Sequence, residues 1–278
     1  MKTFSIGSKN ERVVKETCNL CGKDKTKLYL DCETFKYVKC MKCGLVYQNP
    51  QPVFKDLKRR YKQDYFKYEL ENDENFFNLM KLGLNDIKFF KHPFSYFVNN
   101  RFLDIGCATG LLVKYMQDLG WKSSGLEICR ESAEYGIKNR FVNIIIKRLK
   151  DAQFDDNNFS VIHFSHVIEH VPSPFAFLKE VYRVLAPGGM VIITTPNVNG
   201  FQAKIFGTEW RSAIADHLTL FSKKTLRAML EKAGFKIKKM VTWGGLAKGT
   251  VPDFIKKPVD KLSKIFGFGD VVLFQMTK

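Results

Sequence analysis

The spacing of apolar residues divides the chain into three stretches with different expected structures. After residue 100, short apolar runs alternate with segments of helical periodicity, a pattern typical of a parallel sheet covered by helices. Between residues 53 and 98, aromatic and aliphatic residues recur at helical spacing, which predicts two or three helices. Before residue 50 the chain is polar and contains paired cysteines. The strands predicted for the sheet are 101–105, 123–127, 143–146, 161–165, 190–195, 237–242 and 271–276.

Three domains follow from these boundaries. We predict a small cysteine-containing unit at 1–50, a helical linker or lid at 51–98, and an α/β domain at 99–278, with prolines marking the first boundary. Within the last domain, residues 244–269 alternate apolar and lysine positions at helical spacing, which predicts a basic amphipathic helix. Because this insertion leaves a predicted strand at the edge where ligands bind, we expect it to shape acceptor specificity.

Four of the seven cysteines form two matching pairs. Cys18 and Cys21 precede Gly22, and Cys40 and Cys43 precede Gly44, so each pair is a C-x-x-C-G unit. This spacing is typical of two turns that close one tetrahedral zinc site. All four positions would be ligands, which leaves no coordination position open for water or substrate. We therefore predict a structural zinc ribbon, against the alternative of four unliganded buried thiols.

A glycine-containing turn follows the first predicted strand of the α/β domain. Asp104, Gly106 and Gly110 lie at this turn, and a helical pattern begins directly after it. The next predicted strand ends in Glu127, where a carboxylate can accept hydrogen bonds from both ribose hydroxyls of a nucleoside. The glycine spacing is not that of a dinucleotide site, and Asp104 would repel a phosphate. The pattern favours S-adenosylmethionine, whose ammonium and sulfonium groups are positive.

Several segments together resemble a known family. Residues 104–110 (DIGCATG), Glu127, 159–170, 185–189 (LAPGG) and 195–197 (TPN) resemble the successive motifs of class I S-adenosylmethionine-dependent methyltransferases. Residues 216–222 (DHLTLFS) and the helical segment after them are similar to the ubiquinone-biosynthesis-like branch. The ribbon with residues 44–50 resembles a zinc-ribbon subgroup associated with sugar and surface-glycan modification. The resemblance implies a Rossmann-like, seven-stranded, mostly parallel sheet whose last strand is antiparallel, with an N-terminal zinc ribbon and a helical lid.

The resemblance also implies roles for individual residues. Relatives often carry an aspartate for the adenine amino group just after the third strand, where this chain has Arg148, and we assign that role to Asp151. Ala108 replaces a glycine common in the turn, a change tolerated if its backbone angles are ordinary. The implied cofactor set is Asp104, Gly106 and Gly110 at the methionine end, Glu127 at the ribose, Ile128 and Asp151 at the adenine, and Ser165.

Methyl transfer to a hydroxyl benefits from a general base, and two histidines are candidates. His217 follows Asp216 in the late loop, where the resemblance places a histidine that faces the acceptor, and His166 follows the fourth predicted strand. We take His217 as the first candidate and His166 as the second. Glu169 and His170, which lie close to His166, could equally cap or brace the next helix.

The net charge of +17 changes the picture less than its size suggests. Between residues 101 and 222 basic and acidic residues nearly balance, and most of the surplus lies beyond 222. We expect a basic rim suited to an anionic or phosphorylated small-molecule acceptor, or one that serves solubility alone. An RNA methyltransferase is the alternative, but the cysteine-containing stretch 18–44 has lysines and no arginine for base contacts.

Neither a membrane span nor a signal peptide is evident, which predicts a cytoplasmic protein. The oligomeric state stays open. A zinc-ribbon interaction module with an inactive methyltransferase fold is the non-enzymatic alternative, against which the intact cofactor motifs argue.

Overall fold

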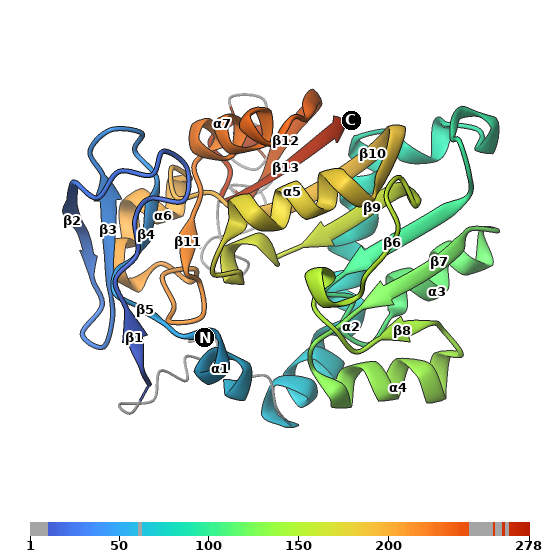
Figure 1. Ribbon diagram of the computed structural model, residues 1–278, viewed down its shortest axis with the longest axis horizontal. Helices are drawn as coiled ribbons and strands as arrows, with labels where there is room; N and C mark the ends of the chain where they lie inside the picture. Colours follow the sequence, from blue (N-terminus) through green and yellow to red (C-terminus); the bar gives the residue numbers. More distant parts are fainter. Residues whose placement is uncertain (1–10, 61–62, 245–257, 259–262, 265–266) are drawn as a thin grey trace.

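The structure, a computed structural model, describes residues 11–60, 63–244, 258, 263–264 and 267–278. Seven strands form its main sheet in the order β12-β13-β10-β9-β6-β7-β8 (Figure 1). Strand β13 runs antiparallel to β10 and β12, whereas β10, β9, β6, β7 and β8 are parallel to their neighbours among themselves. The strands are β6 (Arg101–Ile105), β7 (Lys122–Leu126), β8 (Ile144–Ile145), β9 (Phe159–Ser165), β10 (Leu185–Pro196), β12 (Lys236–Trp243) and β13 (Val271–Thr277). This confirms the predicted Rossmann-like sheet with its antiparallel last strand.

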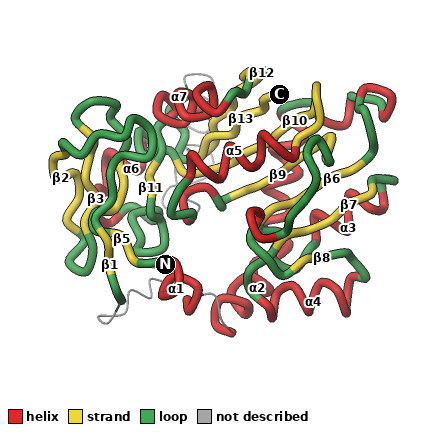
Figure 2. The backbone as a smooth tube through the Cα atoms, viewed as in Figure 1, coloured by secondary structure: helices red, strands yellow, loops and turns green. Residues whose placement is uncertain are grey.

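Both faces of the sheet are buried at its central strand β10, which explains the continuous apolar run from Met190 to Ile193. Along β10, Val191 and Ile193 pack into one core cluster, while Met190 and Ile192 pack into a second cluster on the other face. Helices α5 and α7 cover the first face, and α2 and α3 cover the second (Figures 1 and 2). The helices are α1 (Phe54–Leu57), α2 (Gln63–Asp86), α3 (Leu111–Asp118), α4 (Arg130–Arg140), α5 (Pro174–Val184), α6 (Phe201–Phe206) and α7 (Lys223–Ala233), with 3₁₀ turns η1 (Lys58–Arg60), η2 (Phe89–Lys91), η3 (Phe94–Tyr96), η4 (Leu149–Asp151), η5 (Ile168–His170) and η6 (Gly207–Glu209).

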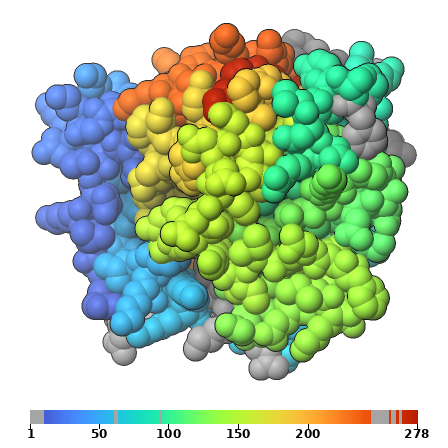
Figure 3. Space-filling view, turned by 45° about the vertical axis from the view of Figure 1, so that its right-hand side comes forward, coloured from blue at the N-terminus to red at the C-terminus, as the bar shows by residue number. Residues whose placement is uncertain are grey.

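The N-terminal region forms a second, smaller sheet that borrows a strand from the other end of the chain. Its order is β11-β4-β3-β2, and β11 belongs to the loop after β10 (Figure 1). The space-filling view shows the blue N-terminal region seated against the yellow and orange parts of the chain (Figure 3). A two-stranded pair, β1 with β5, lies beside it. These strands are β1 (Val13–Val14), β2 (Thr26–Asp31), β3 (Lys36–Cys40), β4 (Val46–Gln48), β5 (Gln51–Pro52) and β11 (Thr219–Leu220).

The amphipathic helix predicted within 244–269 lies largely outside the described residues. Within the described ranges, every helix is too short or too polar to cross a lipid bilayer.

Candidate active site

The turn between β6 and α3 brings bare backbone to the carboxyl edge of the sheet. Gly106 has φ +71°, and a Cβ atom there would lie 2.5 Å from Cγ2 of Val167. Gly110 has φ +76° and directly precedes α3. Both positions therefore require glycine. Ala108 has φ +46°, so its backbone is left-handed and not ordinary as the sequence prediction required.

Glu127 closes the same turn from the end of the neighbouring strand. It is 4% exposed, and its two carboxylate oxygens accept hydrogen bonds from the backbone amides of Ala108 (3.0 Å), Ile128 (2.7 Å) and Cys129 (2.7 Å). Burial raises the pKa of this carboxyl, and the three amides oppose that shift. The amides fix the carboxylate beside the glycine turn, which is the location predicted for the ribose contact.

Asp104, predicted at the methionine end of the cofactor site, is almost fully buried. Its carboxylate accepts a hydrogen bond from Nδ1 of His163 on β9 over 2.7 Å, and both side chains are almost fully buried. A buried carboxylate without such a partner would be strongly destabilising. The pair therefore joins β6 to β9 directly beneath the turn.

Helix α2 covers the glycine turn and adds two carboxylates to it. Asp73 accepts a hydrogen bond from the Thr109 hydroxyl (2.6 Å) and forms an ion pair with Arg140, which also donates to the Thr109 carbonyl (2.8 Å). One helical turn earlier, burial raises the pKa of Glu69 to about 7, and the nearby Glu127 carboxylate acts in the same direction. Neither carboxylate was predicted from the sequence, although their four-residue spacing puts them on one helix face.

The remaining predicted cofactor residues occupy the same edge with different exposure. Ile128 is half-buried after Glu127, and Ser165 is half-buried at the end of β9. Asp151 lies in η4 after β8, where both oxygens face the guanidinium of Arg148. Arg148 in turn stacks on the Phe54 ring, 4.3 Å from its centroid. The adenine contact of Asp151 stays a prediction, because its carboxylate is already paired with Arg148.

A buried carboxylate organises the histidines at the end of β9. Glu169 is 1% exposed, and its oxygens contact Nδ1 of His166 (3.1 Å) and accept from the Thr195 hydroxyl (2.9 Å). Burial alone would raise its pKa, but the hydrogen bond to His166 and the neighbouring histidines lower it to about 2. The carboxylate is therefore ionised at neutral pH and positions an imidazole that is 45% exposed.

His170 and His217 meet beside this carboxylate. Their rings are 4.7 Å apart in an edge-to-face arrangement, and each Nδ1 contacts a backbone carbonyl, of Asp216 (2.9 Å) and Ser212 (2.8 Å) respectively. A carbonyl only accepts, so each Nδ1 carries a proton. Burial lowers the pKa of His217 to about 3, so it is neutral at pH 7.

Glu169, His170 and His217 bring ligand atoms within 4.8 Å of one another. Two imidazoles and a carboxylate could also hold a divalent cation, so metal chemistry is compatible with this cluster.

The four predicted zinc ligands come together in the N-terminal sheet. The sulfurs of Cys18, Cys21, Cys40 and Cys43 all lie within 4.8 Å of one another. Tetrahedral Zn–S bonds of about 2.3 Å require sulfurs about 3.8 Å apart, and the structure gives 3.3 Å for Cys18–Cys43 and 3.5 Å for Cys21–Cys40. The four-sulfur donor set fits a structural Zn²⁺ ion with no open position, and these two sulfur pairs lie slightly closer together than in a metal-bound tetrahedron.

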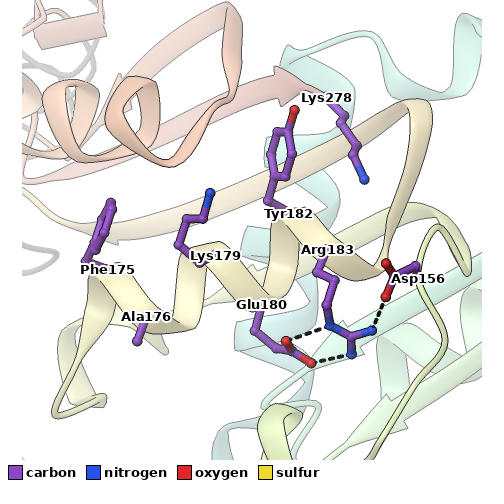
Figure 4. A pocket seen from close by; sticks show the side chains of 8 residues that line it. All are labelled: Asp156, Phe175, Ala176, Lys179, Glu180, Tyr182, Arg183 and Lys278. Atoms are coloured by element: carbon purple, nitrogen blue, oxygen red, sulfur yellow. Dashed lines mark hydrogen bonds and ion pairs between the residues drawn. The ribbon is translucent and has the colours of Figure 1, made fainter.

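The hollow on the outer surface of α5 is a separate feature. Phe175 and Tyr182 form part of its apolar lining, and Lys179 and Lys278 lie around them (Figure 4). Arg183 is already paired with Glu180 and Asp156. Asp156 precedes β9, so this end of the hollow lies at the sheet edge opposite the histidines and the glycine turn.

A methyltransferase-domain family model matches residues 82–239, which is more than half of the chain. The chain belongs to this family. It contains a methyltransferase domain. The matched segment contains the glycine turn, Glu127 and the His166–His170 segment.

Curated relatives of this methyltransferase are similar over part of their length. It is 26% identical over 155 residues to a ubiquinone biosynthesis O-methyltransferase of Aeromonas salmonicida, covering 50% of this chain and 64% of the relative. For the enzyme of the same name from Cereibacter sphaeroides strain ATCC 17029 the identity is 34% over 120 residues, covering 40% and 47%. The chain thus spans about half the length of the curated relatives it matches.

Solved structures share the fold. One is an S-adenosylmethionine-dependent methyltransferase of Thermotoga maritima, a possible histamine N-methyltransferase, with a TM-score of 0.57 and 23% identity over 77% of this chain and 98% of that one. A second is an S-adenosylmethionine-dependent methyltransferase of Archaeoglobus fulgidus, with a TM-score of 0.55 and 21% identity, covering 78% of this chain and 100% of that one.

Glu69 should make stability depend on pH. Its pKa in the folded chain lies above the usual value, so the native state binds more protons than the unfolded state between about pH 4.5 and 7. The free energy of unfolding, measured with urea, should therefore fall as pH rises through this window. Glu69→Gln should reduce this fall, whereas Glu71→Gln at an exposed position of the same helix should not. An unchanged slope in Glu69→Gln would refute the shift.

The four cysteines should bind one metal ion per chain. We expect native mass spectrometry and elemental analysis to give one zinc, and Cys40→Ser to lose it with lower stability. Cys32→Ser, at a half-buried cysteine outside the cluster, is the control and should retain zinc. Full zinc content in Cys40→Ser would contradict the assignment.

Proposed function

We propose that this methyltransferase acts on a hydroxyl oxygen of a small polar acceptor, namely a sugar, a nucleotide sugar or a glycan-decoration precursor. The observation that carries the proposal is the Glu169 carboxylate, which positions a half-exposed imidazole next to the glycine turn. An oxygen acceptor needs such a base, because its proton must leave as the methyl group arrives. The curated relatives named as O-methyltransferases and the resemblance of the ribbon to the glycan-associated subgroup support it.

For the cofactor, the acidic surroundings of the turn are the relevant feature. Glu127, Asp104, Glu69 and Asp73 gather carboxyl groups where a phosphate would be repelled and a cationic ligand favoured. We propose that Glu127 exchanges some of its amide contacts for the ribose hydroxyls. S-adenosylmethionine supplies an electrophilic methyl group there.

We propose that His166 accepts the acceptor proton and that His217 forms the floor of the acceptor site. The acceptor oxygen forms a bond to the methyl carbon as the carbon–sulfur bond breaks, and its proton passes to Nε2 of His166. Glu169 stabilises the resulting imidazolium. His217, the first candidate from the sequence, is 6% exposed, and burial lowers its pKa to about 3, so it is a weak base at neutral pH. Its Nε2 can still accept a hydrogen bond from the acceptor.

The two histidines can be separated by their kinetics. His166→Ala should lower kcat by about 100-fold or more, the usual contribution of a general base, with the dissociation constant for S-adenosylhomocysteine changed less than about threefold. His217→Ala should raise KM for the acceptor more than it lowers kcat. His92→Ala is the matched control, since His92 lies in the loop after η2 and contacts Tyr96. Undiminished turnover in His166→Ala would rule out its role as base.

The acceptor class can be tested with defined probes. Incubation with methyl-labelled S-adenosylmethionine and a panel of nucleoside diphosphate sugars, sugar phosphates and RNA should label a sugar hydroxyl as an alkali-stable methyl ether. Glu127→Ala should abolish labelling of every acceptor. Labelling of RNA alone, with affinity that falls steeply as salt rises, would replace the proposal by the RNA alternative.

A further inference from the structure

The ribbon contacts the loop that carries His217 through buried side chains. The Tyr37 hydroxyl lies 2.8 Å from the carbonyl of His217 and 2.9 Å from that of Ile214. The Gln48 side-chain amide donates to the carbonyls of Ala215 and His217, both over 2.9 Å. Tyr37 is fully buried and Gln48 is 1% exposed. Two side chains of β3 and β4 therefore satisfy three carbonyls of the loop.

Backbone pairing extends this contact toward Glu169. Strand β11, directly after the loop, pairs with β4. In addition, the backbone amide of Gln48 donates to the Leu218 carbonyl (2.8 Å). On its other side the Leu218 amide donates to the carbonyl of Glu169 (2.7 Å). The loop is thus held between the ribbon and the residue that positions His166.

The same ribbon strands lead into the metal ligands. Tyr37 lies three residues before Cys40 on β3, and Gln48 follows Cys43 by five residues at the end of β4. A bound metal ion would fix the connection between these strands. Buried carbonyls that lose their donors are costly, so the loop conformation depends on where β3 and β4 place Tyr37 and Gln48.

We propose that Tyr37 and Gln48 are positioning residues and that the metal-bound ribbon is the template on which the His217 loop folds. Metal occupancy then controls acceptor turnover, while the cofactor edge around Glu127 keeps its affinity. The effect on turnover rests on the proposed function, since it assumes that His217 lies in the acceptor site. The effect on the loop does not.

The experiment compares Tyr37→Phe and Gln48→Leu with Tyr29→Phe, a control on β2 of the same sheet. Histidine-selective ¹⁵N NMR reports the Nδ1–H tautomer of His217, and calorimetry with S-adenosylhomocysteine reports the cofactor site. We expect both test variants to perturb the His217 signal and to lower kcat/KM for the acceptor about five- to tenfold or more, mainly through a higher KM, with the S-adenosylhomocysteine dissociation constant changed less than twofold. Tyr29→Phe should match the wild type in all three readouts.

Wild-type protein stripped of metal provides a second measurement that needs no variant to fold. Hydrogen exchange of residues 212–220 should rise at least tenfold on chelation, with β6 and β9 unchanged, and zinc should restore protection. An unaltered His217 signal in both variants, or unaltered exchange of the loop after stripping, overturns the proposal. If wild-type protein fails to bind S-adenosylhomocysteine while the loop responds as expected, the proposed function falls and the coupling stands.

Discussion

The buried carboxylate of Glu169 is the constraint on which the acceptor side depends. Placing an ionised group where it is 1% exposed is favourable only if partners replace the lost water. Here His166 and Thr195 supply these partners through the side chain, while the backbone carbonyl of the same residue receives the Leu218 amide. One residue therefore fixes both the imidazole after β9 and the start of the segment that returns to the ribbon.

The glycine turn and the surroundings of Glu169 differ in the charged groups that line them. Around the glycine turn carboxyls outnumber the one guanidinium, that of Arg140, and burial together with the neighbouring carboxylates raises the pKa of Glu69 to about 7. Around Glu169 the local groups are imidazoles whose Nδ1 atoms contact the Glu169 carboxylate or backbone carbonyls. A cationic cofactor suits the first environment, and a neutral hydroxyl that must lose a proton suits the second. This division follows from the side chains at the ends of neighbouring parallel strands.

Prediction from the sequence succeeded where the signal was local. The strands of the main sheet were placed to within a few residues, except that β10 begins earlier and β8 is shorter. The proposed preference for His166 over His217 could not be derived from the sequence, because it depends on exposure: the His166 side chain is 45% exposed, whereas His217 is 6% exposed. Ala108 shows the same limit, since its left-handed backbone is visible only in three dimensions.

The sequence by itself determined the α/β class, the paired cysteines and the glycine turn with its acidic partner. Periodicity, spacing and backbone freedom act over a few residues, so they can be recognised along the chain. Tertiary structure alone decided that β11 completes the ribbon sheet, that α2 brings carboxyls over the turn, and that Tyr37 reaches residues 177 and 180 positions away. Such contacts arise because buried polar groups need partners, and packing selects those partners from distant parts of the chain.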